Sequence, residues 1–83
     1  MIHIGLFEGI GGFSLAAEWV GWRTLVTCEI APFPRKILKH YWPEAYHHKD
    51  IHDLTYETIN NELTRRWGTH WRDDDIIVTG GFP

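Results

Sequence analysis

Glycines gather in one short segment near the N-terminus, directly after an apolar run. The segment reads Phe7-Glu8-Gly9-Ile10-Gly11-Gly12. Glycine lets a backbone turn tightly and lets a ligand approach it with no Cβ in the way. A helix that begins behind such a turn offers free N–H groups to a carboxylate or a phosphate. The segment therefore predicts a ligand-binding turn, and the alternative is a tight packing turn without a ligand.

Known nucleotide-binding motifs fit this segment only in part. No Lys-Ser or Lys-Thr pair follows it, which excludes the P-loop of nucleoside triphosphate enzymes. The dinucleotide-binding fingerprint has a third glycine where this chain has Ser14. That fingerprint also has an acidic residue about 20 residues further on, which binds the ribose hydroxyls of an adenosine.

Glu29 stands where such a ribose-binding acid belongs, at the end of a β-branched run. Ile30 follows it and can cover one face of an adenine ring. NAD and S-adenosylmethionine both carry an adenosine, so these two residues leave both ligands open. The alternative for Glu29 is a solvated residue that caps the following helix.

Asp50 and Ile51 form a third candidate pair, directly after a short predicted strand. An aspartate can accept the exocyclic amine proton of adenine, and the backbone N–H of Ile51 can face a ring nitrogen. The alternative is an ordinary Asx-type loop residue. The position at a strand end favours the ligand-binding interpretation.

The elements that must position these segments follow from hydrophobic periodicity. Strands are predicted over 2–7, 24–28, 46–48 and 76–79, the third of them weakly. Helices are predicted over 13–20, 32–42 and 56–67. Gly21 is the predicted C-cap of the first helix, and Thr55 is the predicted N-cap of the third. Both prolines of the second helix are expected in its first turn. In the last helix Ile59, Leu63 and Trp67 recur every four residues on one face.

Strands that alternate with helices predict parallel pairing with right-handed crossovers. We expect an α/β fold: a three-layer, Rossmann-like half-sheet, mostly parallel, with strand order 3-2-1-4 and flanking helices. Ligands of such sheets bind beyond the carboxyl ends of the strands, where the order reverses, here between the first and fourth strands. The fourth strand also runs into a glycine-rich segment, which reads Gly80-Gly81-Phe82-Pro83.

Together these segments resemble a known family. The glycine segment, Cys28-Glu29-Ile30, Asp50-Ile51 and Gly80-Gly81-Phe82-Pro83 stand in the order of the first motifs of the DNA (cytosine-5) methyltransferases. The resemblance implies that residues 1–83 form the S-adenosylmethionine-binding N-terminal part of the catalytic domain. It implies S-adenosylmethionine as cofactor, DNA as substrate of the full-length protein, and these cofactor-binding residues: Phe7, Gly9, Ile10, Gly11, Gly12, Glu29, Ile30, Asp50, Ile51 and Pro83.

The resemblance also implies chemistry for which this sequence does not carry all the parts. In the family a cysteine follows the Gly-Gly-Phe-Pro segment and attacks carbon-6 of a flipped cytosine, whose carbon-5 then takes the methyl group. A later glutamate and a target-recognition region complete the site. We therefore assign no catalytic residue and expect these 83 residues alone to be inactive. Two positions depart from the family pattern: Gly5, where an aspartate is usual, and Glu8, where a small residue is usual.

Other reactive side chains are interpreted as structural. Cys28 is interpreted as a buried, inert thiol, because Glu29 beside it would raise the pKa of the thiol. Four histidines cluster in sequence, and they are His40, His47, His48 and His52. Adjacent residues of a strand point to opposite faces, so ordinary surface or half-buried histidines are favoured over a metal site. Asp73-Asp74-Asp75 predicts a solvated turn, and Trp19 and Trp67 are expected to pack between helix and sheet.

Composition bounds the class of protein. The length of 83 residues is room for one domain, and 43% hydrophobic with 23% charged residues excludes a disordered chain. A net charge of −3 argues against a self-sufficient nucleic-acid binder, which carries a basic stripe. A lone cysteine favours a reducing, cytoplasmic setting, and no apolar run approaches the roughly 18 residues of a membrane span.

Two rival functional classes stay open. One is a fragment of a dinucleotide- or flavin-binding oxidoreductase, and the other is a non-catalytic methyltransferase remnant that acts as a binding module. The fourth strand is expected to leave an apolar edge open, which predicts a homodimer through that edge, a domain swap or poor stability.

Overall fold

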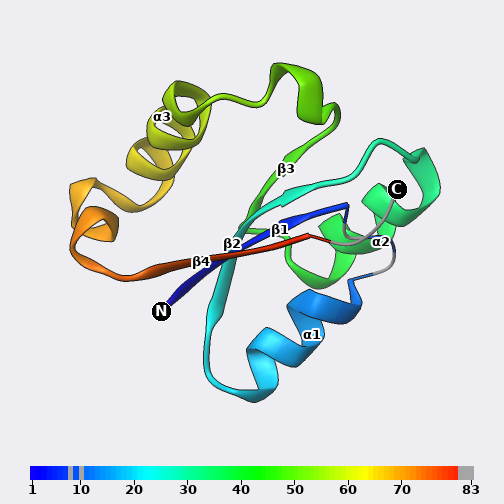
Figure 1. Cartoon of the computed structure of the whole chain (residues 1–83), viewed down its shortest axis with the longest axis horizontal. Coiled ribbons are helices and arrows are strands. Elements are labelled where there is room, and N and C mark those ends of the chain that lie inside the picture. The colour runs from blue at the N-terminus through cyan, green and yellow to red at the C-terminus, as the bar shows by residue number, and fades with distance from the viewer. Residues whose placement is uncertain (8, 10, 81–83) are drawn as a thin grey trace.

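The computed structural model describes residues 1–7, 9 and 11–80, which form a four-stranded parallel sheet with helices on both faces (Figure 1). The strands are β1 (Ile2–Leu6), β2 (Arg23–Cys28), β3 (Tyr46–His48) and β4 (Ile76–Gly80). The helices are α1 (Gly12–Trp19), α2 (Pro32–Tyr41) and α3 (Tyr56–Trp67). Short 3-10 turns cover Ile51–Asp53 and Thr69–Asp73. The sheet order is β3-β2-β1-β4, so the predicted half-sheet is confirmed.

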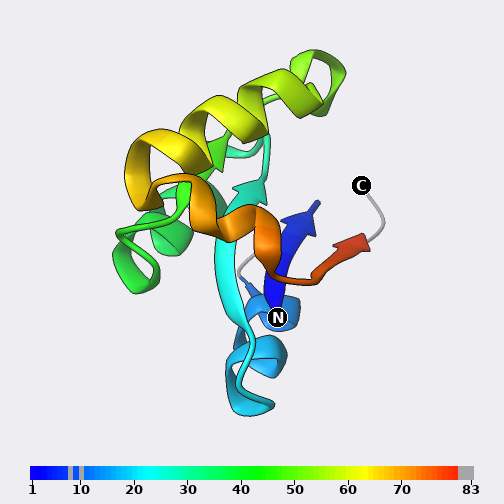
Figure 2. The same cartoon turned by 90° about the vertical axis from the view of Figure 1, so that its left-hand side faces the viewer.

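The helices divide between the two faces of the sheet. Helices α1 and α2 lie on one face and α3 lies on the other, as Figure 1 shows. The first two crossovers both step toward β3, and the third runs back from β3 to β4, so right-handed crossovers place α3 opposite the other two. Figure 2 shows β4 at the edge beside β1. The order therefore reverses between β1 and β4, as predicted.

All four strands reach the same level at their carboxyl ends. Leu6 pairs with Cys28 on one side and with Gly80 on the other, and Cys28 pairs with His48. The residues that follow β1, β2 and β3 therefore share one edge of the sheet, which we call the rim. Ligands of open parallel sheets bind at this edge.

Apolar side chains fill the space between the sheet and α3. The cluster consists of Ile2, Ile4, Leu25, Val26, Leu63 and Trp71. Ile59 and Trp67 pack against it from the same stripe of α3 as Leu63, so the predicted buried face of this helix is confirmed. Each fully buried aliphatic side chain contributes about 1.5–3 kcal/mol through the area it removes from water.

Hydrogen-bonded side chains occupy the opposite face of the sheet. His3 of β1 is fully buried, and its two ring nitrogens lie 2.8 Å from Thr24 Oγ1 of β2 and 2.7 Å from Thr79 Oγ1 of β4. A neutral imidazole has one donor and one acceptor nitrogen, and a threonine hydroxyl can serve either. The ring therefore links three neighbouring strands side to side.

A second imidazole on this face links β2, β3 and the end of α2. His47 Nε2 lies 2.7 Å from the carbonyl oxygen of Trp42, and His47 Nδ1 lies 2.6 Å from Thr27 Oγ1. Because a carbonyl only accepts, Nε2 carries the proton, and Nδ1 of the neutral ring accepts from the threonine. Burial lowers the pKa of His47, and it lowers the pKa of His3 as well.

Helix α1 packs on the sheet through small side chains. Its buried residues are Ser14 and Ala17, and Gly11 before it lies under α2. Trp19 is 76% exposed, so the prediction that it packs between helix and sheet is wrong. The reason is geometric: Trp19 stands two residues beyond Ala17, about 200° further round the helix, and so faces away from the sheet.

Candidate functional site

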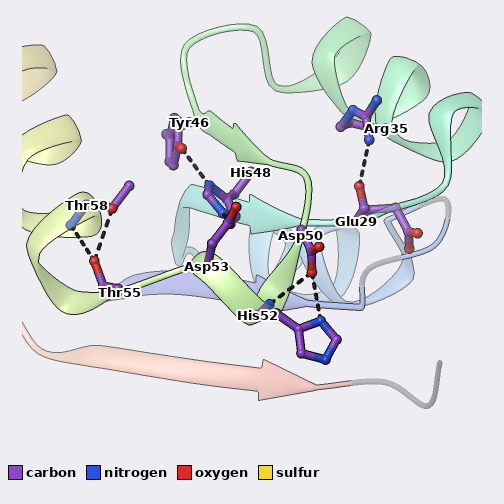
Figure 3. A network of polar contacts seen from close by, with 9 residues as sticks. All are labelled: Glu29, Arg35, Tyr46, His48, Asp50, His52, Asp53, Thr55 and Thr58. Carbon is purple, nitrogen blue, oxygen red and sulfur yellow. Dashed lines mark hydrogen bonds and ion pairs between the residues drawn. The ribbon is translucent and has the colours of Figure 1, made fainter.

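The candidate site residues lie along the rim, at the ends of three neighbouring strands. Phe7 follows β1, Glu29 follows β2, and Asp50 stands two residues after β3. The backbone N–H of Glu29 donates to the carbonyl oxygen of His48 at 3.0 Å, so the pairing of β2 and β3 extends to the rim itself. Figure 3 shows Glu29 and Asp50 on this shared edge.

The glycine turn has an unusual backbone. Phe7, Gly9 and Gly11 have φ values of 53°, 58° and 95°. Positive φ costs a glycine nothing, but it is uncommon for an aromatic residue and stores strain of about 1–3 kcal/mol. Strained backbone of this kind clusters at ligand-binding sites, so the conformation of Phe7 favours the hypothesis of a ligand-binding turn.

Gly11 also has a packing reason to be glycine. A Cβ at this position would lie 3.0 Å from Leu38 Cδ2 and 3.0 Å from Trp42 Cζ3, both on the inner side of α2. Gly12 has no such neighbour within 4 Å and begins α1. Close packing therefore explains the glycine at position 11, as the alternative to a ligand-binding turn predicted. Among the described residues, nothing packs closely enough to require a glycine at position 12.

Glu29 connects the glycine turn to the start of α2. Its Oε1 accepts from the backbone N–H of Gly9 at 2.7 Å, and its Oε2 accepts from the backbone N–H of Ala31, the N-cap residue of α2, at 2.8 Å. The alternative role of Glu29, a cap of the following helix, is therefore correct in part, because one of its oxygens bonds to the N-cap residue of that helix. Each oxygen of a carboxylate has a second lone pair, so each can accept one further hydrogen bond. Two adjacent hydroxyls, as in a ribose, match that capacity.

The backbone around Glu29 is fixed by Arg35 of α2. The Arg35 guanidinium donates to the carbonyl oxygens of Glu29 at 3.2 Å and Ile30 at 3.0 Å. Ile30 is 58% exposed, which leaves an apolar side chain uncovered beside the carboxylate. No sequence pattern singles out Arg35, because its partners are backbone atoms.

Asp50 closes an Asx-type turn, as its alternative interpretation predicted. Its Oδ1 accepts from the backbone N–H of His52 at 3.0 Å and lies 2.9 Å from His52 Nδ1. The bond from the His52 backbone, and then the bond from its ring, lower the pKa of Asp50 below its ordinary value. Ile51, half-buried, begins the 3-10 turn that follows.

A chain of three polar side chains joins β3 to that 3-10 turn. The Tyr46 hydroxyl lies 2.6 Å from His48 Nδ1, and His48 Nε2 lies 2.5 Å from Asp53 Oδ1 (Figure 3). Burial raises the pKa of Tyr46, so this hydroxyl stays protonated and can donate to the ring. With Nδ1 as acceptor, the His48 ring donates from Nε2 to the Asp53 carboxylate, so the tyrosine hydroxyl and both ring nitrogens each have a partner of the right kind.

Cys28 lies at the end of β2, just before the rim, and it is buried. Burial raises the pKa of its thiol to about 11, and the negative charges of Asp50, Glu29 and Asp53 add to the rise. The thiol is therefore protonated at neutral pH, and the prediction that Cys28 is buried is confirmed. Three carboxylates therefore lie close enough to the end of β2 to act on this thiol.

Several hollows border candidate residues, and Ile51 lines one of about 390 Å³ on the α3 side of the sheet. One of about 460 Å³ lies beside Asp50 and is lined by Tyr46, His47, His48, Lys49, Asp50 and Asp53. Another of about 460 Å³ borders the glycine turn between α1 and α2 and is lined by Gly11, Gly12, Leu15, Glu18, Tyr41 and Trp42. The structure thus brings Phe7, Gly9, Glu29 and Asp50 to one rim, with a hollow beside Asp50.

Two of the predicted cofactor residues, Ile10 and Pro83, lie outside the described residues, as does Glu8. The histidines are as predicted: His40 and His52 are exposed, and His47 and His48 are half-buried. The predicted solvated turn at 73–75 is exposed. Sequence reasoning did not identify the hydrogen bonds of His48 and His52 to the two aspartates of the 3-10 turn.

In the described part of the chain, no three His, Cys, Asp or Glu side chains are grouped so that they could hold a metal ion. None of the described helices is both long and apolar enough to cross a membrane. The chain matches no protein-family model and no curated protein sequence.

Proposed function

We propose that this chain binds S-adenosylmethionine along the rim and supplies that site for methylation of cytosine carbon-5 in DNA. When bound, this cofactor supplies a methyl group on a positively charged sulfonium. Glu29 would hold the ribose, Asp50 the exocyclic amine of adenine, and Ile30 one face of the ring. The glycine turn, with Phe7 and Gly9 in left-handed conformations, would hold the amino-acid end.

The observation that carries the proposal is the position of the Glu29 carboxylate between the glycine turn and Asp50. Its two oxygens are fixed by one backbone N–H each, at 2.7 and 2.8 Å, and retain the capacity for two hydroxyls. The backbone N–H of Glu29 donates to the carbonyl oxygen of His48, which joins this residue to the strand that leads into Asp50. A sugar acceptor and an adenine acceptor thus stand on neighbouring strand ends.

The charge of the rim favours S-adenosylmethionine over a dinucleotide. Burial and then the negative charges of Asp50, Glu29 and Asp53 raise the pKa of the Cys28 thiol, so three carboxylates stand near the strand ends. A pyrophosphate brings further negative charge to this place, whereas a sulfonium brings positive charge. Glu29 belongs to both ligand patterns, so it is the charge of Asp50 and Asp53 that supports S-adenosylmethionine over the oxidoreductase alternative.

The cytosine and DNA parts of the proposal rest on the resemblance of the four segments to the cytosine-5 methyltransferases. Among the described residues we assign no nucleophile, because the Cys28 thiol is buried and its pKa is about 11. DNA as the substrate is implied by that resemblance alone. Pairing of a second copy along β4, whose Ile76 and Val78 are exposed at the sheet edge, stays a prediction.

Calorimetric titration with S-adenosylhomocysteine and with NAD tests the proposal. We expect the folded chain to bind the first and not the second, and Glu29→Gln to weaken binding about 10- to 100-fold, because hydrogen bonds to a charged group are worth about 1.5–3 kcal/mol. Glu57→Gln, which changes an exposed glutamate in the first turn of α3, is the matched control and should bind as the unchanged chain does.

Two outcomes would contradict the proposal. Tighter binding of NAD would favour the oxidoreductase fragment. A folded chain that binds neither ligand at millimolar concentration would favour the non-catalytic binding module. Because Glu29 also bonds to Gly9 and Ala31, the circular dichroism of Glu29→Gln is compared with that of the unchanged chain before its affinity is interpreted.

A further inference from the structure

We propose that His52 is a positioning residue of the rim, which orients the Asp50 carboxylate so that one oxygen stays available to the amine of adenine. This inference rests on the proposed cofactor site. According to this inference, His52 makes the site prefer adenine to a base that carries a carbonyl in place of the exocyclic amine.

The geometry that carries the inference is the convergence of two bonds on one atom. The backbone N–H of His52 and its ring Nδ1 lie 3.0 Å and 2.9 Å from the same oxygen, Asp50 Oδ1. Figure 3 shows the ring and the backbone of His52 meeting this oxygen from two directions. Neither of these bonds involves Oδ2, so rotation of the carboxylate is restricted while its second oxygen is left for a ligand.

The charge state of Asp50 suits discrimination between bases. Because the bonds from His52 lower the pKa of Asp50, the carboxylate is ionised at neutral pH and can only accept hydrogen bonds. Adenine presents an amine donor, whereas hypoxanthine presents a carbonyl acceptor at that position. A fixed carboxylate therefore attracts the first base and repels the second. A carboxylate free to rotate can turn away from the carbonyl and loses part of this preference.

The backbone of the turn is held independently of the His52 ring. Two hydrogen bonds of His48 connect the 3-10 turn to β3. The Tyr46 hydroxyl lies 2.6 Å from its Nδ1, and Asp53 Oδ1 lies 2.5 Å from its Nε2. The His52 side chain itself is 89% exposed, and the Asp50 side chain is 41% exposed. Replacing the ring therefore removes its bond to Asp50 without opening a cavity in the core.

The experiment compares two ligands that differ in one ring substituent, S-adenosylhomocysteine and its hypoxanthine counterpart, S-inosylhomocysteine. The readout is the ratio of their dissociation constants for the unchanged chain, His52→Leu and His52→Asn. We expect His52→Leu to reduce the preference for adenine about 3- to 10-fold, the effect of one net hydrogen bond. We expect His52→Asn to restore most of it, because the asparagine Nδ2 can donate from nearly the position of the imidazole Nδ1.

The ratio separates positioning from a general structural role, since a structural loss would weaken both ligands equally. His70→Leu, at an exposed histidine in the turn after α3, is the matched control and should leave the ratio unchanged. An unchanged ratio in His52→Leu, or no recovery in His52→Asn, overturns this inference while the proposed function stands. No binding of S-adenosylhomocysteine by the unchanged, folded chain overturns the proposed function and this inference with it.

Discussion

The two faces of the sheet are held in different ways. On the α3 face, aliphatic and aromatic side chains such as Ile2, Ile4 and Leu63 exclude water around one cluster. On the α1–α2 face, the same strands present buried polar side chains, with His3 bonded to Thr24 and Thr27 bonded to His47. Strand β1 serves both arrangements, because Ile2 and Ile4 point to one face and His3 to the other.

The difference shows where positional precision comes from. Apolar packing is non-directional, so it holds α3 against the sheet without fixing which atoms meet. Hydrogen bonds of 2.6–2.8 Å between an imidazole and a hydroxyl are directional, so His3 and His47 fix neighbouring strands relative to each other. The rim depends on that alignment, because its residues stand at the ends of these strands.

The largest expected effect concerns the apolar face. Leu63→Ala removes a fully buried side chain from the cluster and should lower the free energy of unfolding by about 2–5 kcal/mol. Leu15→Ala on α1 removes a side chain that is 41% exposed and should change it by about 1 kcal/mol or less. Urea denaturation of both variants measures the contrast, and equal losses would mean that the two faces do not differ as described.

A smaller loss is expected at the junction of α1 with α2. Gly11→Ala forces alanine into a φ of 95° and brings its Cβ within 3.0 Å of Leu38 and Trp42, which should cost about 2–4 kcal/mol. Gly12→Ala, one residue on, meets nothing within 4 Å and should be neutral or stabilising by up to about 1 kcal/mol. The pair is measured by thermal unfolding, and a well-tolerated Gly11→Ala would show that α2 does not press on the turn.

The smallest effect is a pH dependence confined to the polar face. Burial lowers the pKa of His3 and of His47 below 6.5, so the unfolded chain takes up these protons first. Stability should therefore fall as the pH drops below about 6.5, and the loss should level off below the folded pKa values. The pKa of Glu62 lies below its ordinary 4.5, so that carboxylate titrates at lower pH.

The variant that tests this assignment is His3→Gln. Its melting temperature should change less between pH 7 and pH 5 than that of the unchanged chain, because one of the two buried imidazoles is gone. His70→Gln, an exposed histidine, should leave the slope as it was. A melting temperature that rises on acidification, or identical slopes for all three chains, would show that buried histidines do not set the pH response.

Much of the fold was predictable from the sequence because its signals are local. Short β-branched runs, prolines 32 and 34 in a first helical turn, and the four-residue recurrence in α3 specify the elements and their order. Thr55 Oγ1 accepts from the N–H of Thr58 at 3.1 Å, the cap that the sequence indicates. The face that α1 buries was not predictable in this way. Its apolar residues face outward, and it packs through Ser14 and Ala17, whose small size permits close approach.

The candidate site was predictable to the level of strand ends and no further. Glycines and acids at those positions indicate a rim, and the parallel register brings Phe7, Glu29 and Asp50 to it. Two features of the site depend on tertiary structure and cannot be read from the spacing of residues in the sequence. They are the left-handed conformation of Phe7 and the hydrogen bond from Gly9 to Glu29. The pairing of His52 with Asp50 is local, but a histidine two residues after an aspartate is too common a pattern to single out.

The hydrogen bond from the Gly9 amide to the Glu29 carboxylate has a kinetic consequence. Since this bond forms within the chain itself, the conformational entropy of fixing Gly9 is lost when the chain folds and not when a ligand binds. For the cofactor that we propose, association should therefore be limited by encounter rather than by formation of this bond.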